Sequence, residues 1–248
     1  MKFKGILFDI NGTLVDILTD ESRDDIYRAI SNFMRYQGIA IDADSLKKDY
    51  FARLQRQKKL SGEQYPEFDA VALWREFLQE QLPKGAKGRL GKTKLKNMPN
   101  FLAEMYRAAS MYRLQLYPGV TEVLTSLADQ YRLAALSDAQ SAWAMPELRA
   151  VGLAVFFESV IVSGDLGYRK PDPRIFSLAS YQMQLPMEDI LFVGNDMYRD
   201  IYGAQVSGMK TVFFASNQGR TKYRDTEADY IIYSFAELPT AISFLENK

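Results

Sequence analysis

The sequence predicts an α/β protein with a Rossmann-like, three-layer core around a parallel sheet, together with an inserted all-helical domain. After residue 112, short apolar segments typical of buried strands alternate with helical segments, and this alternation favours a parallel sheet wound in one hand. Residues 17–112 show helical periodicity and no strand pattern. We therefore expect residues 1–16 and 113–248 to form the core and residues 17–112 to form the inserted domain.

The first strand is expected at residues 3–10. Residues 5–8, Gly-Ile-Leu-Phe, are continuously apolar, as in a strand buried on both faces. Further strands are expected at residues 132–136, 159–163, 190–193, 211–214 and 230–233. Core helices are expected at residues 120–130, 146–151, 173–183, 198–206 and 235–245. Helices of the inserted domain are expected between residues 22 and 38 and at residues 45–60, 67–81 and 98–111.

The composition narrows the available chemistry. The 248 residues include no cysteine and no histidine. Disulfides, thiol nucleophiles, imidazole bases, Ser-His-Asp triads and His-ligated zinc are therefore excluded. Catalysis would have to use carboxylates, Lys, Ser or Thr, Tyr and a hard cation held by oxygen ligands.

Charge and hydropathy restrict the partners and the location. Lys+Arg and Asp+Glu each number 31, so the chain lacks the basic excess typical of nucleic-acid binding. No apolar stretch is long enough to span a bilayer, and no signal-peptide pattern precedes the first strand. We expect a cytoplasmic protein that binds a small molecule and neither nucleic acid nor a membrane. The sequence leaves the oligomeric state open.

Polar side chains follow four of the expected strands, at the edge where the carboxyl ends of parallel strands meet. Asp9 ends the first strand and opens the run Asp-Ile-Asn-Gly-Thr-Leu, and Ser137 ends the second strand. Lys170 lies in the loop after the third strand, and residues 194–200, Gly-Asn-Asp-Met-Tyr-Arg-Asp, follow the fourth. One edge of the sheet would thus present a carboxylate nucleophile, a hydroxyl, an ammonium and a pair of carboxylates.

This ordered set resembles the haloacid dehalogenase-like hydrolase superfamily over almost the full length of the core. The motifs are Asp-x-x-Gly-Thr-Leu, Leu-Tyr-Pro-Gly-Val, Leu-Ser-Asp, Gly-Tyr-Arg-Lys-Pro-Asp-Pro and Val-Gly-Asn-Asp-x-x-x-Asp, in the family's order. Residues 17–112 occupy the position at which many members insert a helical cap. The roughly 30 residues between Ser137 and Lys170 leave no room for a second large cap.

The resemblance implies phosphatase-like chemistry supported by Mg²⁺. It implies that Asp9 attacks phosphorus to form an aspartyl-phosphate and binds Mg²⁺ together with the backbone carbonyl of Asn11. It also implies that Lys170 neutralises charge on the phosphoryl group and on Asp9. A small phosphorylated metabolite is the expected substrate. The candidates for holding its phosphate by hydroxyl or backbone donors are Gly12, Thr13, Ser137 and Asp138.

The fourth motif leaves the register of the metal site open. Asn195 stands where many members carry the Asp ligand. Asp196 comes one residue later and lies four residues before Asp200, so the two would share a helical face. We favour Asp196 as the metal carboxylate, keep Asn195 as a second candidate ligand, and expect Asp200 to support them from outside the coordination shell.

Two positions depart from the family pattern. Asn11 replaces the Asp that protonates the leaving oxygen and then activates water, and such acid–base help typically contributes about 100- to 10,000-fold. Asp138 stands where many members have Asn. The favoured interpretation is a phosphohydrolase that is slow or restricted to good leaving groups. The alternatives are a catalytically silent phospho-ligand-binding protein and a 2-haloacid dehalogenase-type hydrolase.

Substrate specificity would come from the cap, which closes over the core in this family and contacts the non-reacting part of the substrate. The candidate contacts are aromatic or basic: Tyr50, Arg53, Tyr65, Trp74 and the basic segment 84–96. They do not identify the substrate.

Overall fold

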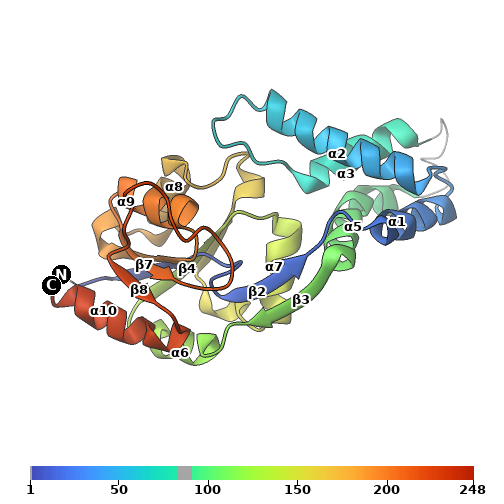
Figure 1. The fold of residues 1–248 in the computed structure, drawn as a ribbon. Helices are drawn as coiled ribbons and strands as arrows, with labels where there is room; N and C mark the ends of the chain where they lie inside the picture. Colours follow the sequence, from blue (N-terminus) through green and yellow to red (C-terminus); the bar gives the residue numbers. More distant parts are fainter. Residues whose placement is uncertain (1, 83–90) are drawn as a thin grey trace.

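The computed structural model describes residues 2–82 and 91–248. An α/β core and a helical cap lie side by side and are joined by a narrow two-stranded ribbon (Figure 1). The two ends of the chain lie together, at the end of the core that is remote from the cap (Figure 1). Residues 84–90 of the basic segment proposed to contact substrate lie outside the described residues.

The core is built on a six-stranded parallel sheet, as the sequence predicts. The strand order is β5-β4-β1-β6-β7-β8, and each neighbouring pair is parallel. The strands are β1 (Gly5–Phe8), β4 (Arg132–Ser137), β5 (Ser159–Val162), β6 (Ile190–Gly194), β7 (Lys210–Phe214) and β8 (Tyr230–Ile232). Since β1 lies between β4 and β6, the strand ends that lead to Asp9, Ser137 and Asn195 are adjacent.

Helices cover both faces of this sheet, and alternate residues of β1 are buried against opposite layers. Ile6 and Phe8 belong to the hydrophobic cluster that includes α6 and α10, whereas Leu7 belongs to the cluster that includes α8 and α9. The helices of the core are α6 (Val120–Ala128), α7 (Ser141–Ala150), α8 (Pro173–Met183), α9 (Gly203–Val206) and α10 (Leu238–Glu246). The sheet therefore has an apolar layer on each side, as in a three-layer fold.

Two core helices differ from the expectation. α7 begins at Ser141 rather than at Pro146, because the Gln140 carbonyl already accepts the N–H of Ala144. A π-helical turn, Met197–Tyr202, precedes α9 where the sequence predicts a continuous α-helix. Such turns occur frequently at functional sites.

The cap is a helical bundle around an aromatic interior. Its helices, within the described residues, are α1 (Asp24–Tyr36), α2 (Ala43–Leu60), α3 (Ala70–Gln81) and α5 (Lys92–Ser110). Tyr50 stacks on Tyr106 with ring centroids 4.4 Å apart and also packs against Trp74. Arg53 is buried beside this cluster and pairs with Asp49 at 2.8 Å. Tyr50, Arg53 and Trp74 thus hold the cap together, and the expectation that they contact substrate is wrong.

The ribbon between cap and core corrects the expectation that residues 17–112 contain no strand. β2 (Val15–Thr19) pairs antiparallel with β3 (Met111–Leu116), and both expected domain boundaries fall within these strands. Val15 and Leu116, which are paired, both pack on the hydrophobic core. The two strands lie about ninety residues apart in the chain, so local periodicity gave no sign of their pairing.

The segment between α2 and α3 docks the cap onto the core beside the loop that follows β5 (Figure 1). Pro66 forms a β-bridge with Tyr168. The buried Gln140 side chain reaches across from the core, accepts the N–H of Ala70 at 2.9 Å and donates to the carbonyl of Phe68 at 2.7 Å. One core side chain therefore satisfies two cap backbone groups at the start of α3.

Replacing Gln140 by leucine is expected to loosen this junction. Gln140→Leu would leave the N–H of Ala70 and the carbonyl of Phe68 without their partner, at a cost of about 2 to 4 kcal/mol in the free energy of unfolding. Urea unfolding followed by circular dichroism measures the change. Gln130→Leu is the matched control, because that exposed amide donates only to the nearby Ser126 carbonyl at the end of α6. Equal midpoints for the two variants would contradict the proposed role of Gln140.

Candidate active site

The structure brings together the polar residues that the sequence places at four strand ends. Asp9 lies just beyond β1, Ser137 ends β4, Lys170 follows β5, and Asn195 and Asp200 follow β6. Each of the five is at most 5% exposed. A cluster of this polarity with so little exposure must satisfy its charges internally or with a ligand.

Lys170 is the centre of the charge network. Its Nζ lies 2.6 Å from Asp9 Oδ1, 2.6 Å from Asp200 Oδ1 and 3.3 Å from the carbonyl oxygen of Leu136. Burial lowers the pKa of Lys170, but Asp200 and Asp9 more than offset this and hold the pKa above its ordinary value. Lys170 is therefore a fixed cation shared by two carboxylates.

The second oxygen of Asp9 lies next to a hydroxyl. Thr13 Oγ1 is 3.1 Å from Asp9 Oδ2 and 3.2 Å from Asn195 Oδ1, so these two oxygens face a common point. Burial raises the pKa of Asp9 to about 7, against the lowering effect of Lys170, and Asp200 adds to the rise. An additional cation beside Asp9 would favour its ionised, nucleophilic form.

Gly12 shapes the turn between Asp9 and Thr13. Its φ of 88° lies in the left-handed region, and an added Cβ would come within 2.2 Å of Asn195 Nδ2. Its N–H already donates to the carbonyl of Val15 at 2.8 Å. This N–H is therefore not free for a phosphate as expected, and Gly12 instead permits the close approach of the turn to Asn195.

Asp196 accepts hydrogen bonds at both of its carboxylate oxygens, which bears on its expected role as a metal ligand. Its Oδ1 accepts the N–H groups of Tyr198 and Arg199 at 3.0 and 2.8 Å and so caps the π-helical turn. Its Oδ2 accepts the N–H of Arg220 at 3.2 Å and pairs with Arg199 Nε at 3.1 Å. Burial alone would raise the pKa of Asp196, but these donors outweigh it and lower the pKa. With each oxygen engaged twice, the geometry does not favour Asp196 as a metal carboxylate.

Asp200 and Asn195 form the inner part of the fourth motif. Asp200 Oδ2 accepts the backbone N–H groups of Asn195 at 3.1 Å and Asp196 at 3.0 Å, while Oδ1 holds Lys170. This arrangement fixes the turn that carries Asn195 and directs the Asn195 carboxamide toward Thr13. Of the two candidate ligands, the geometry favours Asn195.

The Asp138 carboxylate faces the Lys170 loop and the Arg199 guanidinium. Its Oδ1 accepts the backbone N–H of Lys170 at 3.0 Å, and its Oδ2 lies 3.7 Å from Arg199 Nη1. Burial raises the pKa of this carboxyl, and Lys170 and Arg199 offset part of the rise. Asp138 therefore positions the Lys170 loop, and its expected contact with phosphate stays a prediction.

Within the described part of the chain, three buried side-chain oxygens of the cluster have no hydrogen-bond partner: Asn11 Oδ1, Ser137 Oγ and Asp138 Oδ2. The third faces Arg199 at 3.7 Å, whereas the first two belong to uncharged side chains. Buried polar atoms normally have a hydrogen-bond partner. The Asn11 and Ser137 oxygens, which lie at the same edge of the sheet as Asp9, are therefore available to a ligand or to water.

The donors present fit Mg²⁺ only when a substrate phosphate completes the set. Asp9, the backbone carbonyl of Asn11 and the carboxamide oxygen of Asn195 are all hard oxygen donors, as Mg²⁺ prefers. No group of three acidic side chains able to hold a metal occurs in residues 2–82 and 91–248. One carboxylate plus a substrate phosphate is a common way for proteins to bind this ion.

A cavity beside the site is lined by residues that sequence reasoning missed. It measures about 520 Å³ and is bordered by Arg169, Lys170, Arg199 and Arg220. Arg169 and Arg199 are the chain neighbours of Lys170 and Asp200, so their positions within the motifs were a usable signal. Arg220 belongs to no motif. Tyr65, one of the predicted cap contacts, also borders this cavity.

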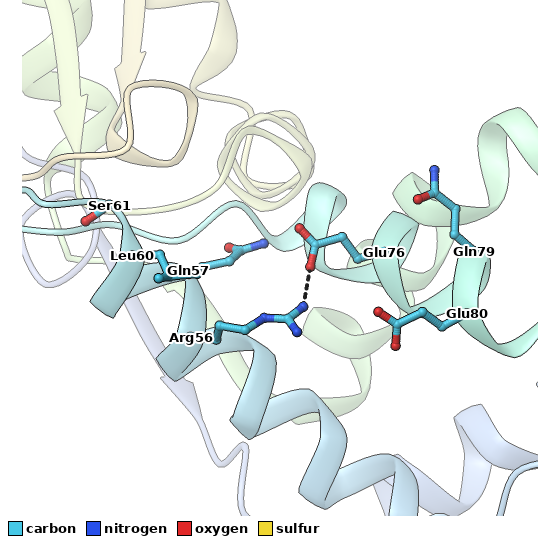
Figure 2. A pocket seen from close by; sticks show the side chains of 7 residues that line it. All are labelled: Arg56, Gln57, Leu60, Ser61, Glu76, Gln79 and Glu80. Atoms are coloured by element: carbon cyan, nitrogen blue, oxygen red, sulfur yellow. Dashed lines mark hydrogen bonds and ion pairs between the residues drawn. The ribbon is translucent and has the colours of Figure 1, made fainter.

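A larger hollow of about 590 Å³ lies on the cap between α2 and α3 (Figure 2). Figure 2 shows Arg56 of α2 directed at Glu76 of α3, and their side chains meet at 2.9 Å. Glu80, on the same hollow, is bonded to Arg53. The hollow shares no residue with the strand-end cluster, and its charges neutralise one another, so we do not assign it a catalytic role.

Glu67 is a buried acid next to the Lys170 loop. Its Oε1 accepts the N–H of Phe68 at 3.0 Å, its Oε2 accepts the Ser163 hydroxyl at 3.2 Å, and Lys58 lies 3.9 Å away. Burial raises the pKa of Glu67, and the hydrogen bond from Phe68 and the charge of Lys58 offset only part of this rise.

The raised pKa of Glu67 predicts a pH-dependent cost. The folded chain keeps the Glu67 proton to a higher pH than the unfolded chain, so this group's contribution to stability is complete below pH about 4.3 and is lost as pH rises through the folded pKa. Glu67→Gln should therefore raise the melting temperature relative to wild type more at pH 8 than at pH 4.5. The exposed Glu104→Gln is the control, and an equal difference at both pH values would refute the prediction.

Fold and site together define a class: an α/β protein whose buried Asp9–Lys170–Asp200 network lies at the carboxyl edge of the sheet. The chain belongs to the haloacid dehalogenase-like hydrolase family, which matches residues 3–208. It is therefore an enzyme of the hydrolase class, and its named relatives include several phosphatases.

Several relatives align along the full length of the chain at low identity. Glyceraldehyde 3-phosphate phosphatase of Pyrococcus furiosus is 28% identical over 100% of this chain and 95% of its own. Human N-acylneuraminate-9-phosphatase is 23% identical over 100% of this chain and 96% of its own. These phosphatases thus align along cap and core alike.

Solved structures show the same fold. A 2-haloacid dehalogenase from Pseudomonas syringae pv. Tomato DC3000 superposes with a TM-score of 0.66 at 21% identity, covering 98% of this chain and 99% of that one. A predicted phosphoglycolate phosphatase from Haemophilus somnus 129PT gives 0.58 at 23% identity, covering 97% and 98%. In the described parts of the chain, no helix combines the length and apolarity that crossing a membrane requires.

Proposed function

We propose that the chain is a Mg²⁺-dependent phosphohydrolase that acts on a small phosphorylated metabolite through an aspartyl-phosphate at Asp9. The observation that carries the proposal is the setting of Asp9 at the end of the central strand, between the Lys170 ammonium and the Thr13 hydroxyl. The phosphatases among the full-length relatives support the same reaction class.

In this mechanism a carboxylate oxygen of Asp9 attacks phosphorus, the bond from phosphorus to the leaving oxygen breaks, and the phosphoryl group is held on Asp9. Lys170 remains charged throughout and stabilises negative charge on the transferring group. Thr13 and Ser137 offer hydroxyls to phosphate oxygens. Water then attacks phosphorus, releases inorganic phosphate and regenerates the Asp9 carboxylate.

Mg²⁺ would be held by Asp9, the Asn11 backbone carbonyl and Asn195, and when bound it supplies positive charge that offsets that of the phosphate. The chain's own Lys170 cannot replace it, because that ammonium is already shared by two carboxylates. The proposed ligand set includes Asn195 in place of the expected Asp196, because both carboxylate oxygens of Asp196 already accept hydrogen bonds.

The Asn11 side chain limits the reaction. A carboxamide neither protonates a departing oxygen nor removes a proton from water near neutral pH. Acyl phosphates and activated aryl phosphates leave without a proton, so we expect turnover to favour them over alkyl phosphates.

A dehalogenase-type reaction is the second candidate, and one observation favours it. Asn11 and Asn195 both carry carboxamides, and Asp196 caps the π-helical turn. Asp9 is therefore the one carboxylate in the proposed metal set. Displacement of halide from a 2-haloacid needs a carboxylate nucleophile but no proton for the leaving group.

The test is an assay of phosphate release from acetyl phosphate and 4-nitrophenyl phosphate, with Mg²⁺ and with chelator. We expect release that requires Mg²⁺ and is lost in Asp9→Ala. Release that survives in Asp9→Ala would overturn the nucleophile assignment. Halide release from 2-chloropropionate without Mg²⁺, with no phosphate release, would favour the second candidate. No turnover of any compound would favour a silent phospho-ligand-binding protein.

A further inference from the structure

The cavity beside Lys170 lies between cap and core. Its walls come from the cap segment that includes Tyr65, from the loop after β5 with Arg169, from the π-helical turn with Arg199, and from the loop after β7 with Arg220. Its volume of about 520 Å³ is within the range of small-molecule sites. Because Lys170 is also part of its lining and contacts Asp9, the cavity adjoins the proposed reaction centre.

The lining carries more positive charge than the chemistry at Asp9 requires. Four of the lining residues are cationic, and a single one, Asp196, is a carboxylate. Asp196 and Asp138 both pair with Arg199, and Lys170 is held by Asp9 and Asp200. The other two arginines of the lining, Arg169 and Arg220, take part in none of these pairs.

In the part of the chain that the structure describes, neither Arg169 nor Arg220 forms an ion pair with a carboxylate within 4.0 Å. Arg220 packs instead over the ring of Tyr198, with 5.4 Å from its guanidinium carbon to the ring centroid. Stacking of this kind orients a guanidinium and leaves its edge free for hydrogen bonds. Two arginines without an ion-pair partner among the described residues thus line one cavity, one from the loop after β5 and one from the loop after β7.

Guanidinium groups match the geometry of carboxylates and phosphates, to which they donate two parallel hydrogen bonds. We propose that Arg169 and Arg220 bind a second anionic group of the substrate, a carboxylate or a second phosphate, at a distance from the phosphoryl group that reacts with Asp9. This inference rests on the proposed function, because it takes the reacting phosphate to lie between Lys170 and Thr13. The substrate class is then a phosphomonoester with two anionic ends.

A binding experiment tests this without relying on turnover. The probes are three benzylphosphonates, which are not hydrolysed: one with a 4-carboxylate, one with a second phosphonomethyl group at the 4-position, and one with an uncharged 4-methoxycarbonyl group. Titration calorimetry on the intact chain with Mg²⁺ gives the three dissociation constants. We expect the two doubly anionic probes to bind about 10- to 100-fold more tightly than the uncharged one, as charge-assisted hydrogen bonds do. Comparing the first two probes shows whether the site prefers a carboxylate or a phosphate.

The variants Arg169→Gln and Arg220→Gln should reduce this preference toward equality. Arg224→Gln is the matched control, because this arginine lies over Tyr223 and does not line the cavity. Equal affinity of wild type for all three probes would overturn the inference. So would an equal loss for all three probes in the Arg169 and Arg220 variants, because these arginines would then hold the reacting end. Absence of phosphatase activity with the preference intact would overturn the proposed function alone.

Discussion

Asn11→Asp should accelerate hydrolysis of alkyl phosphates by roughly 100- to 10,000-fold, because it restores a group that gives a proton to the leaving oxygen and takes one from water. The same change should have a much smaller effect on the first step with acetyl phosphate, whose leaving group departs as an anion. Pre-steady-state rates of butanol release from butyl phosphate and of acetate release from acetyl phosphate, with Mg²⁺, measure this contrast in the first step.

The rate of the second step, in which water hydrolyses the aspartyl-phosphate, tests the role of Asn11 independently. With Asn11, no side chain activates the water that attacks the aspartyl-phosphate, so a rapid-quench experiment with acetyl phosphate should show a burst of product followed by slow turnover. Asn11→Asp should abolish the burst. The control is Asn217→Asp, an exposed position whose carboxamide bonds the Tyr117 hydroxyl. Equal acceleration of alkyl and acyl substrates in the first step would show that the introduced carboxylate acts through something other than proton transfer.

Lys170→Met should destabilise the fold by about 3 to 5 kcal/mol at pH 8, because removing the shared cation leaves Asp9 and Asp200 buried together without a partner. The loss should be smaller at pH 5, where Asp9, with its raised pKa, takes up a proton. The rate of phosphate release should fall by roughly 100- to 1,000-fold, as expected for the loss of one preorganised charge. Urea unfolding and initial rates measure the two effects.

Two further variants separate charge from packing. Lys170→Met combined with Asp200→Asn should recover much of the stability but none of the activity, since one uncompensated charge is removed while the phosphoryl group remains unneutralised. Lys4→Met breaks an exposed pair with Asp189 of similar length, 2.7 Å, and should cost at most about 1 kcal/mol. A Lys170→Met chain as stable as the Lys4→Met chain would rule out the buried network as described.

Much of the core could be predicted because its signals are local. The apolar run Gly5–Phe8 and the alternation of strands with helices follow from burial on both faces of a parallel sheet. Asp9, Ser137 and Lys170 could be placed together because the carboxyl ends of adjacent parallel strands meet.

The errors share a cause, which is dependence on partners distant in the chain. β2 and β3 are strands only because they pair with each other and pack on the core. The spacing of Asp196 to Asp200 favours Asp196 as a ligand, but the backbone N–H of Arg220, from a loop 24 residues away, occupies its second oxygen. The prediction also assumed that Asp196 and Asp200 share one face of an α-helix, whereas the chain forms a π-helical turn there.

The paired strands that carry the cap have a topological consequence. The chain leaves the core along β2 and returns along β3, with Thr19 paired to Met111 at the cap end of the ribbon. The whole cap is thus an excursion that departs and returns at neighbouring positions, so a short turn joining these two residues would close the core without rerouting it. Removing the cap in this way would keep the strand order of the core and would uncover the edge of the sheet that carries Asp9.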